Sequence, residues 1–243
     1  MHASNKPQNA NAPEVALTVG RHAQAVLAMW HGSLGRTVRC VPTRRTLAVQ
    51  VGDDWLFGKL RRGAAHSAAA EWRWLHVLPL LGLQVPEPVA WIGHKNRSLL
   101  VTVGLPGRSL DAWALDAVRE GWFDELVRYA CRCVAPVVRR LHDRGLIYRD
   151  LYWNHVFALD PHSDAPPMFL DVERVCEVRW QSRRWLVKDL AGLLASVPVP
   201  LPKRAGLRFL RAYLGERLRA HRLLLRAIVA KASRIKAHVP RYG

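Results

Sequence analysis

Two aspartates, each placed after a short apolar segment, are the residues whose types and spacing best fit a chemical reaction. Asp150 follows the run that ends at Tyr148, and Asp171 follows the apolar segment 168–170. An Arg-Asp pair between apolar segments is either a buried ion pair or a catalytic loop, and the second carboxylate favours the loop. In kinase-type phosphoryl transfer one aspartate accepts the proton of the attacking hydroxyl and another holds magnesium. We therefore predict Asp150 as the catalytic base and Asp171 as a magnesium ligand.

A lysine near the end of a predicted strand is the next candidate. Lys59 lies in the segment 55–60, and the predicted helix 64–81 carries Glu71 as its only acidic residue. A buried ammonium costs free energy unless something binds it. In kinases such a lysine contacts the nucleotide phosphates and pairs with a glutamate of the following helix. The alternative is that Lys59 extends to solvent and Glu71 is a surface charge.

Four motifs around these residues occur in a set order. They are Leu-His-x-x-Gly at 141–145, Arg-Asp-Leu-Tyr-x-x-His at 149–155, Leu-Asp-Val-x-Arg-Val at 170–175 and Arg-Arg-Trp-x-x-Lys-Asp-Leu-Ala-x-Leu at 183–193. Together they resemble the lipopolysaccharide kinases of the Kdo/WaaP group, which phosphorylate sugars of the bacterial lipopolysaccharide inner core. The resemblance extends from about residue 37 to residue 214.

The resemblance implies an α+β, protein-kinase-like bilobal fold. After a disordered tail at 1–13, we expect a small antiparallel β-sheet lobe at 14–103 and a mainly helical lobe at 104–243. It also implies ATP and Mg²⁺ as cofactors. The segment between Asp171 and Asp189 is too short for a peptide-docking platform, which argues against a protein as the acceptor. Its Arg and Trp residues favour a phosphorylated sugar instead. The alternative is that the segment is a basic surface loop with core tryptophans.

Further site residues follow from the same resemblance. The turn containing Arg44 and Arg45 replaces the glycine-rich loop of protein kinases, and Thr102 and Val103 lead into the hinge beside the nucleotide. His155 stands where protein kinases have a magnesium-binding asparagine. Because magnesium prefers oxygen ligands, His155 either orients a metal-bound water or phosphate, or is a core histidine with a satisfied hydrogen bond.

The positions of apolar residues predict the elements that carry these groups. A helix is expected at 15–30, and Pro136 should bend or break a long helix at 123–143. Asp189 should cap the backbone of the catalytic loop, and Tyr148 should pack beneath that loop. Strands are expected at 37–41, 46–51, 55–60, 83–91 and 99–103.

Charge is the unusual feature of the composition. The 243 residues contain 37 Lys and Arg against 19 Asp and Glu, a net charge of +18. Residues 203–243 hold twelve basic residues and Glu216 alone as an acid. Two helices with basic outer faces are expected there, suited to an anionic membrane surface or an acidic carrier protein. The four cysteines show no CxxC or zinc spacing and indicate reduced thiols.

These observations predict an ATP-dependent sugar kinase acting on heptose I or Kdo of the lipopolysaccharide core. The polar segment 1–13 does not resemble a signal peptide, and no apolar run is long enough to span a bilayer, so we expect a cytoplasmic enzyme, peripheral at the inner membrane. Alternatives are a protein kinase and a pseudokinase or basic adaptor for an acidic partner. Nucleic-acid binding would rest on charge alone, and we expect none.

Overall fold

The computed structural model describes residues 14–17, 20–63, 68–178, 182–215 and 218–237. Within these ranges the chain forms two compact units. The first contains the chain up to His76 together with Pro86–Gly104, and the second contains Val77–Val85 and the chain from Leu105 onward. Relative to the predicted lobes, Gly104 falls in the first unit and Val77–Val85 fall in the second. Residues 1–13, predicted as a tail, lie outside the described residues.

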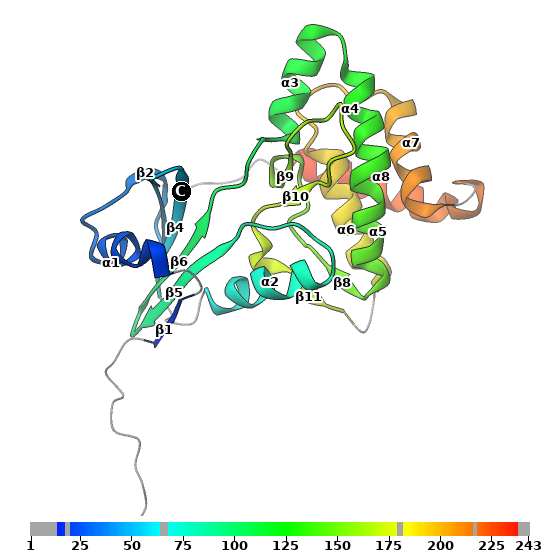
Figure 1. The fold of residues 1–243 in the computed structure, drawn as a ribbon. Coiled ribbons are helices and arrows are strands. Elements are labelled where there is room, and N and C mark those ends of the chain that lie inside the picture. The colour runs from blue at the N-terminus through cyan, green and yellow to red at the C-terminus, as the bar shows by residue number, and fades with distance from the viewer. Residues whose placement is uncertain (1–13, 18–19, 64–67, 179–181, 216–217, 238–243) are drawn as a thin grey trace, which may run out of the picture. The chain divides into compact units, whose positions relative to one another are not determined.

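The first unit is built on an antiparallel sheet of six strands, in the spatial order β1-β5-β6-β4-β3-β2 (Figure 1). Two-residue turns join β2 to β3 and β3 to β4, and Gly52 in the second turn has a φ of 60°, which glycine adopts without steric cost. The strands are β1 (Glu14–Leu17), β2 (Arg36–Val41), β3 (Arg44–Val51), β4 (Asp54–Arg62), β5 (Pro88–His94) and β6 (Arg97–Val103).

One face of this sheet is covered by α1 (Ala23–His31), and the prediction of a helix at 15–30 is wrong at its start, residues 15–17. Residues 14–17 form β1 and pair with β5, and the helical turns begin only with η1 (Gly20–His22). Val26 and Met29 of α1 pack on Leu56, Leu99 and other apolar residues of the sheet. The helix ends at Gly32, whose φ of 80° closes the last turn.

The segment 83–91, predicted as one strand, divides between the two units. Strand β5 begins only at Pro88, whereas Gln84 belongs to the second unit and forms an isolated bridge to Met168. Pro86 and Pro88 have no amide hydrogen and therefore interrupt the pairing of this segment. Helix α2 (Ala69–Leu80), which precedes it, runs from the first unit into the second.

The second unit is mainly helical, with short strands that carry the loops of interest (Figure 1). In the part of this unit that the structure describes, β7 (Arg108–Ser109), β9 (Val156–Ala158) and β10 (Met168–Phe169) form one sheet, and β8 (Leu146–Ile147) pairs with β11 (Cys176–Glu177). The α-helices are α3 (Leu110–Glu120), α4 (Phe123–Tyr129), α5 (Ala135–Asp143), α6 (Ser182–Ala195), α7 (Lys203–Leu214) and α8 (Arg222–Ala237).

The long helix predicted at 123–143 is interrupted where proline requires it. Between α4 and α5 the backbone passes through a π-turn, η2 (Ala130–Val134), and Pro136 stands in the first turn of α5. Proline lacks the amide hydrogen of a regular helix and its ring clashes with the preceding turn, so the hydrogen-bond pattern widens there. The predicted break at Pro136 is therefore confirmed.

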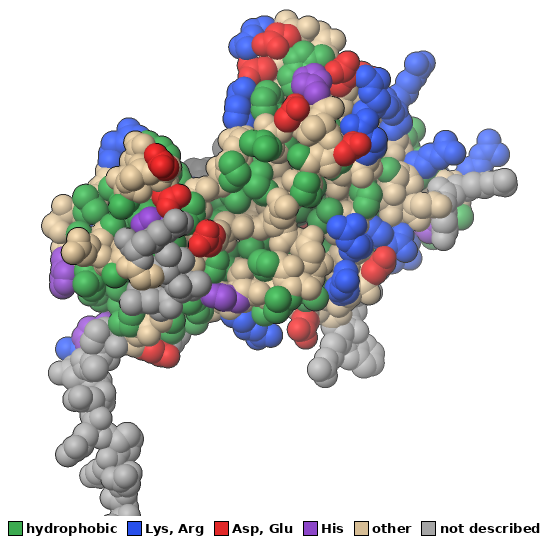
Figure 2. Space-filling model, viewed as in Figure 1, with side chains coloured by type: hydrophobic (Ala, Val, Ile, Leu, Met, Phe, Trp, Pro, Cys, Tyr) green, Lys and Arg blue, Asp and Glu red, His purple; other side chains and the backbone are tan. Residues whose placement is uncertain are grey.

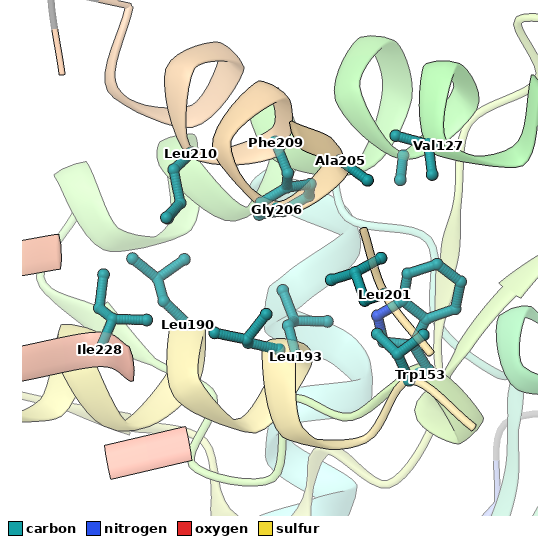
Figure 3. Close-up of a pocket in the computed structure, with 13 residues that line it drawn as sticks. Val127, Trp153, Leu190, Leu193, Leu201, Ala205, Gly206, Phe209, Leu210 and Ile228 are labelled. Carbon is teal, nitrogen blue, oxygen red and sulfur yellow. The ribbon is translucent and has the colours of Figure 1, made fainter. Parts of the chain in front are cut away.

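An apolar cavity of about 50 Å³ lies in the core of the second unit, among α4, α6, α7 and α8 (Figure 3). Trp153, 7% exposed, contributes one wall and belongs to η3 (Trp153–His155), which follows Asp150. The amide of Trp153 also donates to the hydroxyl of Ser196 at 2.9 Å. The chain after Asp150 is thus anchored in the apolar core. Other residues around the cavity are Val127, Leu190, Leu193, Phe209, Leu210 and Ile228.

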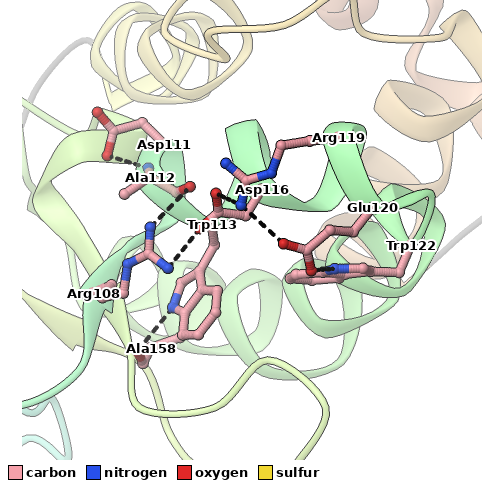
Figure 4. Close-up of polar contacts among 9 residues, drawn as sticks. All are labelled: Arg108, Asp111, Ala112, Trp113, Asp116, Arg119, Glu120, Trp122 and Ala158. Carbon is pink, nitrogen blue, oxygen red and sulfur yellow. Dashed lines mark hydrogen bonds and ion pairs between the residues drawn. The ribbon is translucent and has the colours of Figure 1, made fainter.

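A polar network of residues from β7 and α3 contacts strand β9 (Figure 4). The guanidinium of Arg108 pairs with Asp116 at 2.6 Å and stacks on the ring of Trp113 at 4.7 Å. The indole of Trp113 donates to the carbonyl of Ala158, the last residue of β9, at 3.1 Å. Because β9 begins directly after His155, this network helps to position a predicted site residue.

The C-terminal helices carry the basic character expected of them. Figure 2 shows Lys and Arg side chains gathered on the second unit, over α5 and α7. Apolar residues of these helices divide into two groups: Leu210 and Ile228 are buried, whereas Leu207, Leu223 and Val229 are 46%, 69% and 54% exposed. Among the described residues, we find no helix with the length and apolar character needed to cross a membrane.

Candidate active site

In the first unit, a buried carboxylate holds two cations. Glu71, in the first turn of α2, is 2% exposed. The Lys59 Nζ atom lies 2.5 Å from its Oε1, and the Arg61 Nη2 atom lies 3.0 Å from its Oε2. Lys59 and Arg61 are two residues apart on β4 and so share one face of the sheet. The alternative in which Glu71 is a surface charge is therefore excluded.

Strand register decides which other predicted residues share that face with Lys59. Directly paired residues of neighbouring strands project to the same side of a sheet. Arg44 pairs with Arg61, and Thr102 pairs with Phe57. Positions 57, 59 and 61 of β4 project to one face, so Arg44 and Thr102 lie on the face of Lys59.

Two of the residues predicted to bind the nucleotide project elsewhere. Arg45 pairs with Leu60, and Val103 pairs with Leu56, so both lie on the opposite face, which α1 covers. The amide of Val103 is also engaged, because it donates to the carbonyl of Glu87 at 2.9 Å. The strand parity corrects the prediction for Arg45: its side chain is on the wrong face to accompany Lys59.

In the second unit, a fully buried carboxylate organises the loop that contains Asp150. Asp189 is 0% exposed and accepts hydrogen bonds from the amides of Tyr148 at 2.6 Å and Arg149 at 2.7 Å. The predicted capping role of Asp189 is confirmed. Tyr148 is itself fully buried and donates its hydroxyl to the carbonyl of Leu170 at 2.7 Å, so it packs beneath the loop as predicted.

Behind Asp189 lies a hydrogen-bond chain that the sequence did not suggest. The His142 Nε2 atom lies 3.2 Å from the Asp189 carboxylate, and its Nδ1 atom lies 2.8 Å from the hydroxyl of Tyr213. A carboxylate only accepts, so Nε2 carries the hydrogen and Nδ1 accepts from Tyr213. Burial raises the pKa of Tyr213, which keeps its hydroxyl protonated as a donor. The chain fixes the orientation of Asp189.

Backbone strain marks both predicted aspartates. Arg149, directly before Asp150, has a φ of 72°, and Asp171 has a φ of 66°. Left-handed backbone at a residue other than glycine costs about 1–2 kcal/mol and persists only where surrounding contacts hold it. At Arg149 the holding contact is the 2.7 Å bond from its amide to Asp189. Such strain is concentrated at functional sites.

A hairpin brings the second predicted aspartate next to the catalytic loop. Strands β9 and β10 pair, and the amide of Leu170 donates to the carbonyl of His155 at 2.8 Å. The His155 Nδ1 atom in turn lies 2.8 Å from the carbonyl of Asp150. Asp150, His155 and the residue before Asp171 are thus joined by consecutive hydrogen bonds, although they are distant in the sequence.

The ring of His155 has a defined tautomer. A carbonyl oxygen only accepts, so Nδ1 carries the hydrogen and donates to Asp150. In the neutral ring Nε2 then bears a lone pair, which is able to accept a hydrogen bond from water or to bind a metal. One ring nitrogen of His155 is therefore satisfied within the protein, as the histidine alternative of the prediction requires, and a role toward a metal-bound water or phosphate stays a prediction.

The carboxylate of Asp150 is partly screened by a cation. The Arg174 Nη1 atom lies 2.9 Å from one carboxylate oxygen of Asp150 and 3.3 Å from the other. The Asp150 side chain is 15% exposed and that of Arg174 is 46% exposed. The Asp150 carboxylate is thus partly exposed, and its cationic partner is the more exposed of the two side chains.

Comparison with known proteins identifies the family. Residues 30–213 match the family described as "Lipopolysaccharide kinase (Kdo/WaaP) family". The chain belongs to this family. It is accordingly an ATP-dependent phosphotransferase with an alcohol group as acceptor, as predicted.

Curated relatives match this kinase over most of its length. The "Lipopolysaccharide core heptose(I) kinase WaaP" of Escherichia coli K12 is 27% identical over 262 residues, covering 95% of this chain and 97% of the relative. The protein of the same description in Pseudomonas aeruginosa is 28% identical over 242 residues, covering 86% and 89%.

Solved structures show the same fold. The structure described as "WaaP in complex with acyl carrier protein" superposes with a TM-score of 0.73 at 25% identity, covering 91% of this kinase and 99% of that chain. An aminoglycoside-3'-phosphotransferase of type VIII superposes with a TM-score of 0.60 at 17% identity, covering 87% and 99%. The predicted α+β, protein-kinase-like fold is confirmed.

Sequence reasoning missed three groups at this site. Arg61 is the second partner of Glu71, Arg174 is the partner of Asp150, and the pair of His142 and Tyr213 supports Asp189. The alternation of β4 could have revealed Arg61, because it stands two positions after Lys59. The contacts of Arg174 with Asp150 and of His142 with Asp189 join residues that are distant in the sequence, so no local pattern predicts them.

Proposed function

We propose that this kinase transfers the γ-phosphate of ATP to a hydroxyl of heptose I in the lipopolysaccharide inner core. The curated relatives in E. coli and P. aeruginosa, both described as heptose(I) kinases, support heptose I over the alternative acceptor Kdo. The observation that carries the chemistry is the accessible carboxylate of Asp150, held in a strained loop by the buried carboxylate of Asp189.

In the proposed reaction, Asp150 accepts the proton of the attacking sugar hydroxyl. The hydroxyl oxygen forms a bond to the γ-phosphorus, and the bond from that phosphorus to the β–γ bridging oxygen breaks, which yields ADP and a sugar phosphate. Arg174, bound to both carboxylate oxygens, turns aside to admit the hydroxyl. Because its side chain is 46% exposed, this movement costs little.

The nucleotide is proposed to meet the Lys59 face of the sheet. The pairing with Glu71 fixes the ammonium of Lys59, which then contacts the ATP phosphates. Arg44 on the same face adds a bidentate donor for phosphate oxygens. We further propose that Thr102, which lies on this face by strand register, borders the nucleotide base.

The donor set around Asp171 fits magnesium. The carboxylate of Asp171 is a hard oxygen donor, and the Nε2 lone pair of His155 is suited to accept from a metal-bound water. Hydrogen bonds hold both residues at one end of the β9–β10 hairpin. When bound, magnesium neutralises charge on the transferring phosphoryl group. The protein contributes the position of these donors.

The surroundings of the reaction are proposed from the charge of the C-terminal helices. An anionic membrane surface suits the exposed Arg and Lys residues of α7 and α8 and the exposed Leu207, Leu223 and Val229. Each basic residue near such a surface contributes about 1 kcal/mol to the free energy of membrane binding. This supports action at the cytoplasmic face of the inner membrane. The structure of a relative in complex with acyl carrier protein supports an acidic carrier protein as a partner.

Transfer of labelled γ-phosphate tests the function directly. The purified kinase is incubated with core fragments that end at Kdo or at heptose I. We expect labelling of the heptose-containing fragment, and Asp150→Asn should lower the rate about 10²–10⁴-fold because proton transfer contributes by that factor. The matched control Asp143→Asn removes an exposed carboxylate and should change the rate less than twofold. Labelling of Kdo-only fragments alone would contradict the heptose assignment.

A further inference from the structure

An open cavity of about 780 Å³ lies between α6 and α8 in the second unit. Six of its nine lining residues are basic and none is acidic. Three of the six come from α6, two come from α8, and the last is Arg149 of the catalytic loop. Such a concentration of like charge raises the electrostatic potential inside a concave surface and attracts anions. We call this cavity the α6–α8 pocket.

The cations in the pocket are packed around one aromatic ring. The guanidiniums of Arg149 and Arg184 lie 5.2 and 5.8 Å from the ring centre of Trp185, and the ammonium of Lys188 lies 5.8 Å from it. One indole face offers weak compensation for several positive charges. The arrangement holds the cations close together while leaving their hydrogen-bond donors for a ligand.

Two observations indicate that the pocket is suited to an anion. The Arg149 Nε atom is buried and makes no hydrogen bond within the described residues. Burial, followed by the charges of Arg174 and Arg149, lowers the pKa of Lys188, so the charged form of this lysine is not fully compensated. A buried guanidinium donor without an acceptor is costly. An anionic group with several oxygens would satisfy both residues at once.

The pocket adjoins the reacting centre. Arg149 directly precedes Asp150, and the charges of Asp150 and Arg174 both act on Lys188. A group bound beside Lys188 would therefore be attached close to the hydroxyl that Asp150 orients. The volume exceeds that of a single phosphate, so the pocket has room for a sugar that carries the anionic group.

We infer that the α6–α8 pocket binds a phosphate- or carboxylate-bearing sugar of the acceptor, next to the sugar that is phosphorylated. This inference rests on the proposed function. It gives Lys231 and Arg234 on the C-terminal helix a role in acceptor specificity. An acceptor stripped of its anionic groups should be a poor substrate, and the arginine-rich start of α6 selects for charge as well as sugar shape.

The test is charge reversal on α8, which leaves the catalytic loop unchanged. The variant Lys231→Glu/Arg234→Glu is compared with Arg226→Glu/Lys236→Glu, which makes the same charge change on the same helix at residues that do not line the pocket. We expect the first variant to raise the KM for the anionic acceptor at least tenfold, with kcat and the KM for ATP changed less than twofold. With a soluble core fragment as acceptor, so that membrane attachment plays no part, the control should stay within twofold in all three constants.

Inorganic pyrophosphate serves as a probe of the pocket itself. It should compete with the acceptor in the unmodified kinase and lose this effect in Lys231→Glu/Arg234→Glu. Should charge reversal reduce folding, Lys231→Ala/Arg234→Ala replaces it with the same expectations. Equal KM values for variant and control, an effect confined to the KM for ATP, or loss of carrier-protein binding alone would each overturn the inference.

The two proposals fail in different ways. A kinase that labels no inner-core fragment refutes the proposed function, whereas direct calorimetric titration of pyrophosphate into the protein and the α8 variant still measures the pocket. A kinase that labels the heptose fragment equally well with and without its anionic groups retains the proposed function and refutes the pocket.

Discussion

Replacing Asp189 by Asn should separate the support of the catalytic loop from its chemistry. The buried carboxylate accepts from the amides of Tyr148 and Arg149 and from His142, at 2.6, 2.7 and 3.2 Å. An amide has one oxygen, so at least one of the three donors then faces an NH₂ group. Hydrogen bonds to charged groups contribute about 1.5–3 kcal/mol each. We expect the free energy of unfolding to fall by about 2–4 kcal/mol.

The same substitution should reduce turnover without changing substrate binding. Loss of the bond from the Arg149 amide releases the left-handed backbone before Asp150, and the carboxylate of Asp150 then leaves its position. We expect kcat to fall at least tenfold at 25 °C, where most of the protein remains folded, with the KM for ATP unchanged. Misplacement of a reacting group by about 1 Å is enough for such a loss.

Urea unfolding and steady-state kinetics measure the two effects. The control is Asp143→Asn, which removes the carboxylate of an ion pair with Arg139 whose side chains are 55% and 41% exposed. That change should cost less than about 1 kcal/mol. The reasoning is refuted if Asp189→Asn costs no more than the control, or if its kcat is unchanged while its stability falls.

Three further outcomes are expected. Glu71→Gln should lower the free energy of unfolding by about 3 kcal/mol in urea titrations and raise the KM for ATP, because two largely buried cations lose their counter-charge. The control Glu120→Gln, at an exposed carboxylate, should do neither. The pKa of Lys188 is lowered, so its ammonium loses its proton at a lower pH than that of an ordinary lysine. The KM for an anionic acceptor should therefore begin to rise at a correspondingly lower pH, and Lys188→Arg should remove this pH dependence. Burial raises the pKa of Cys131 and Cys133, so iodoacetamide should label the exposed Cys40 first, as measured by mass spectrometry. Faster labelling of Cys131 would contradict its burial.

Local patterns predicted the elements whose signals are complete within a short segment. The alternation at 55–60 placed Lys59 on a strand, and Pro136 marked the π-turn between α4 and α5. The order of the four motifs indicated the family that the comparisons confirm. The helix predicted at 15–30 was wrong at residues 15–17 because pairing with β5, which lies far away in the sequence, decides their conformation.

Side-chain facing was less accessible to sequence reasoning. Arg44 and Arg45 are neighbours in one turn, and only the register with β4 shows that Arg44 shares the face of Lys59 while Arg45 does not. Similarly, Leu207 and Leu210 both fit a helical stripe, yet packing buries only the second. A periodic pattern gives the period of an element, and the neighbouring element determines which phase is buried.

The sequence by itself predicted the chemistry that we propose for this kinase, from two aspartates after apolar segments, a lysine on a strand and a glutamate on the following helix. These assignments depend on residue type and local spacing, which the chain carries along its length. Only the tertiary structure decided which groups support that chemistry. The bonds of Asp189 to the catalytic loop, the pair of Arg174 with Asp150 and the gathering of α6 and α8 around Trp185 join residues distant in sequence. Their energies arise from burial and geometry, which exist only once the chain has folded.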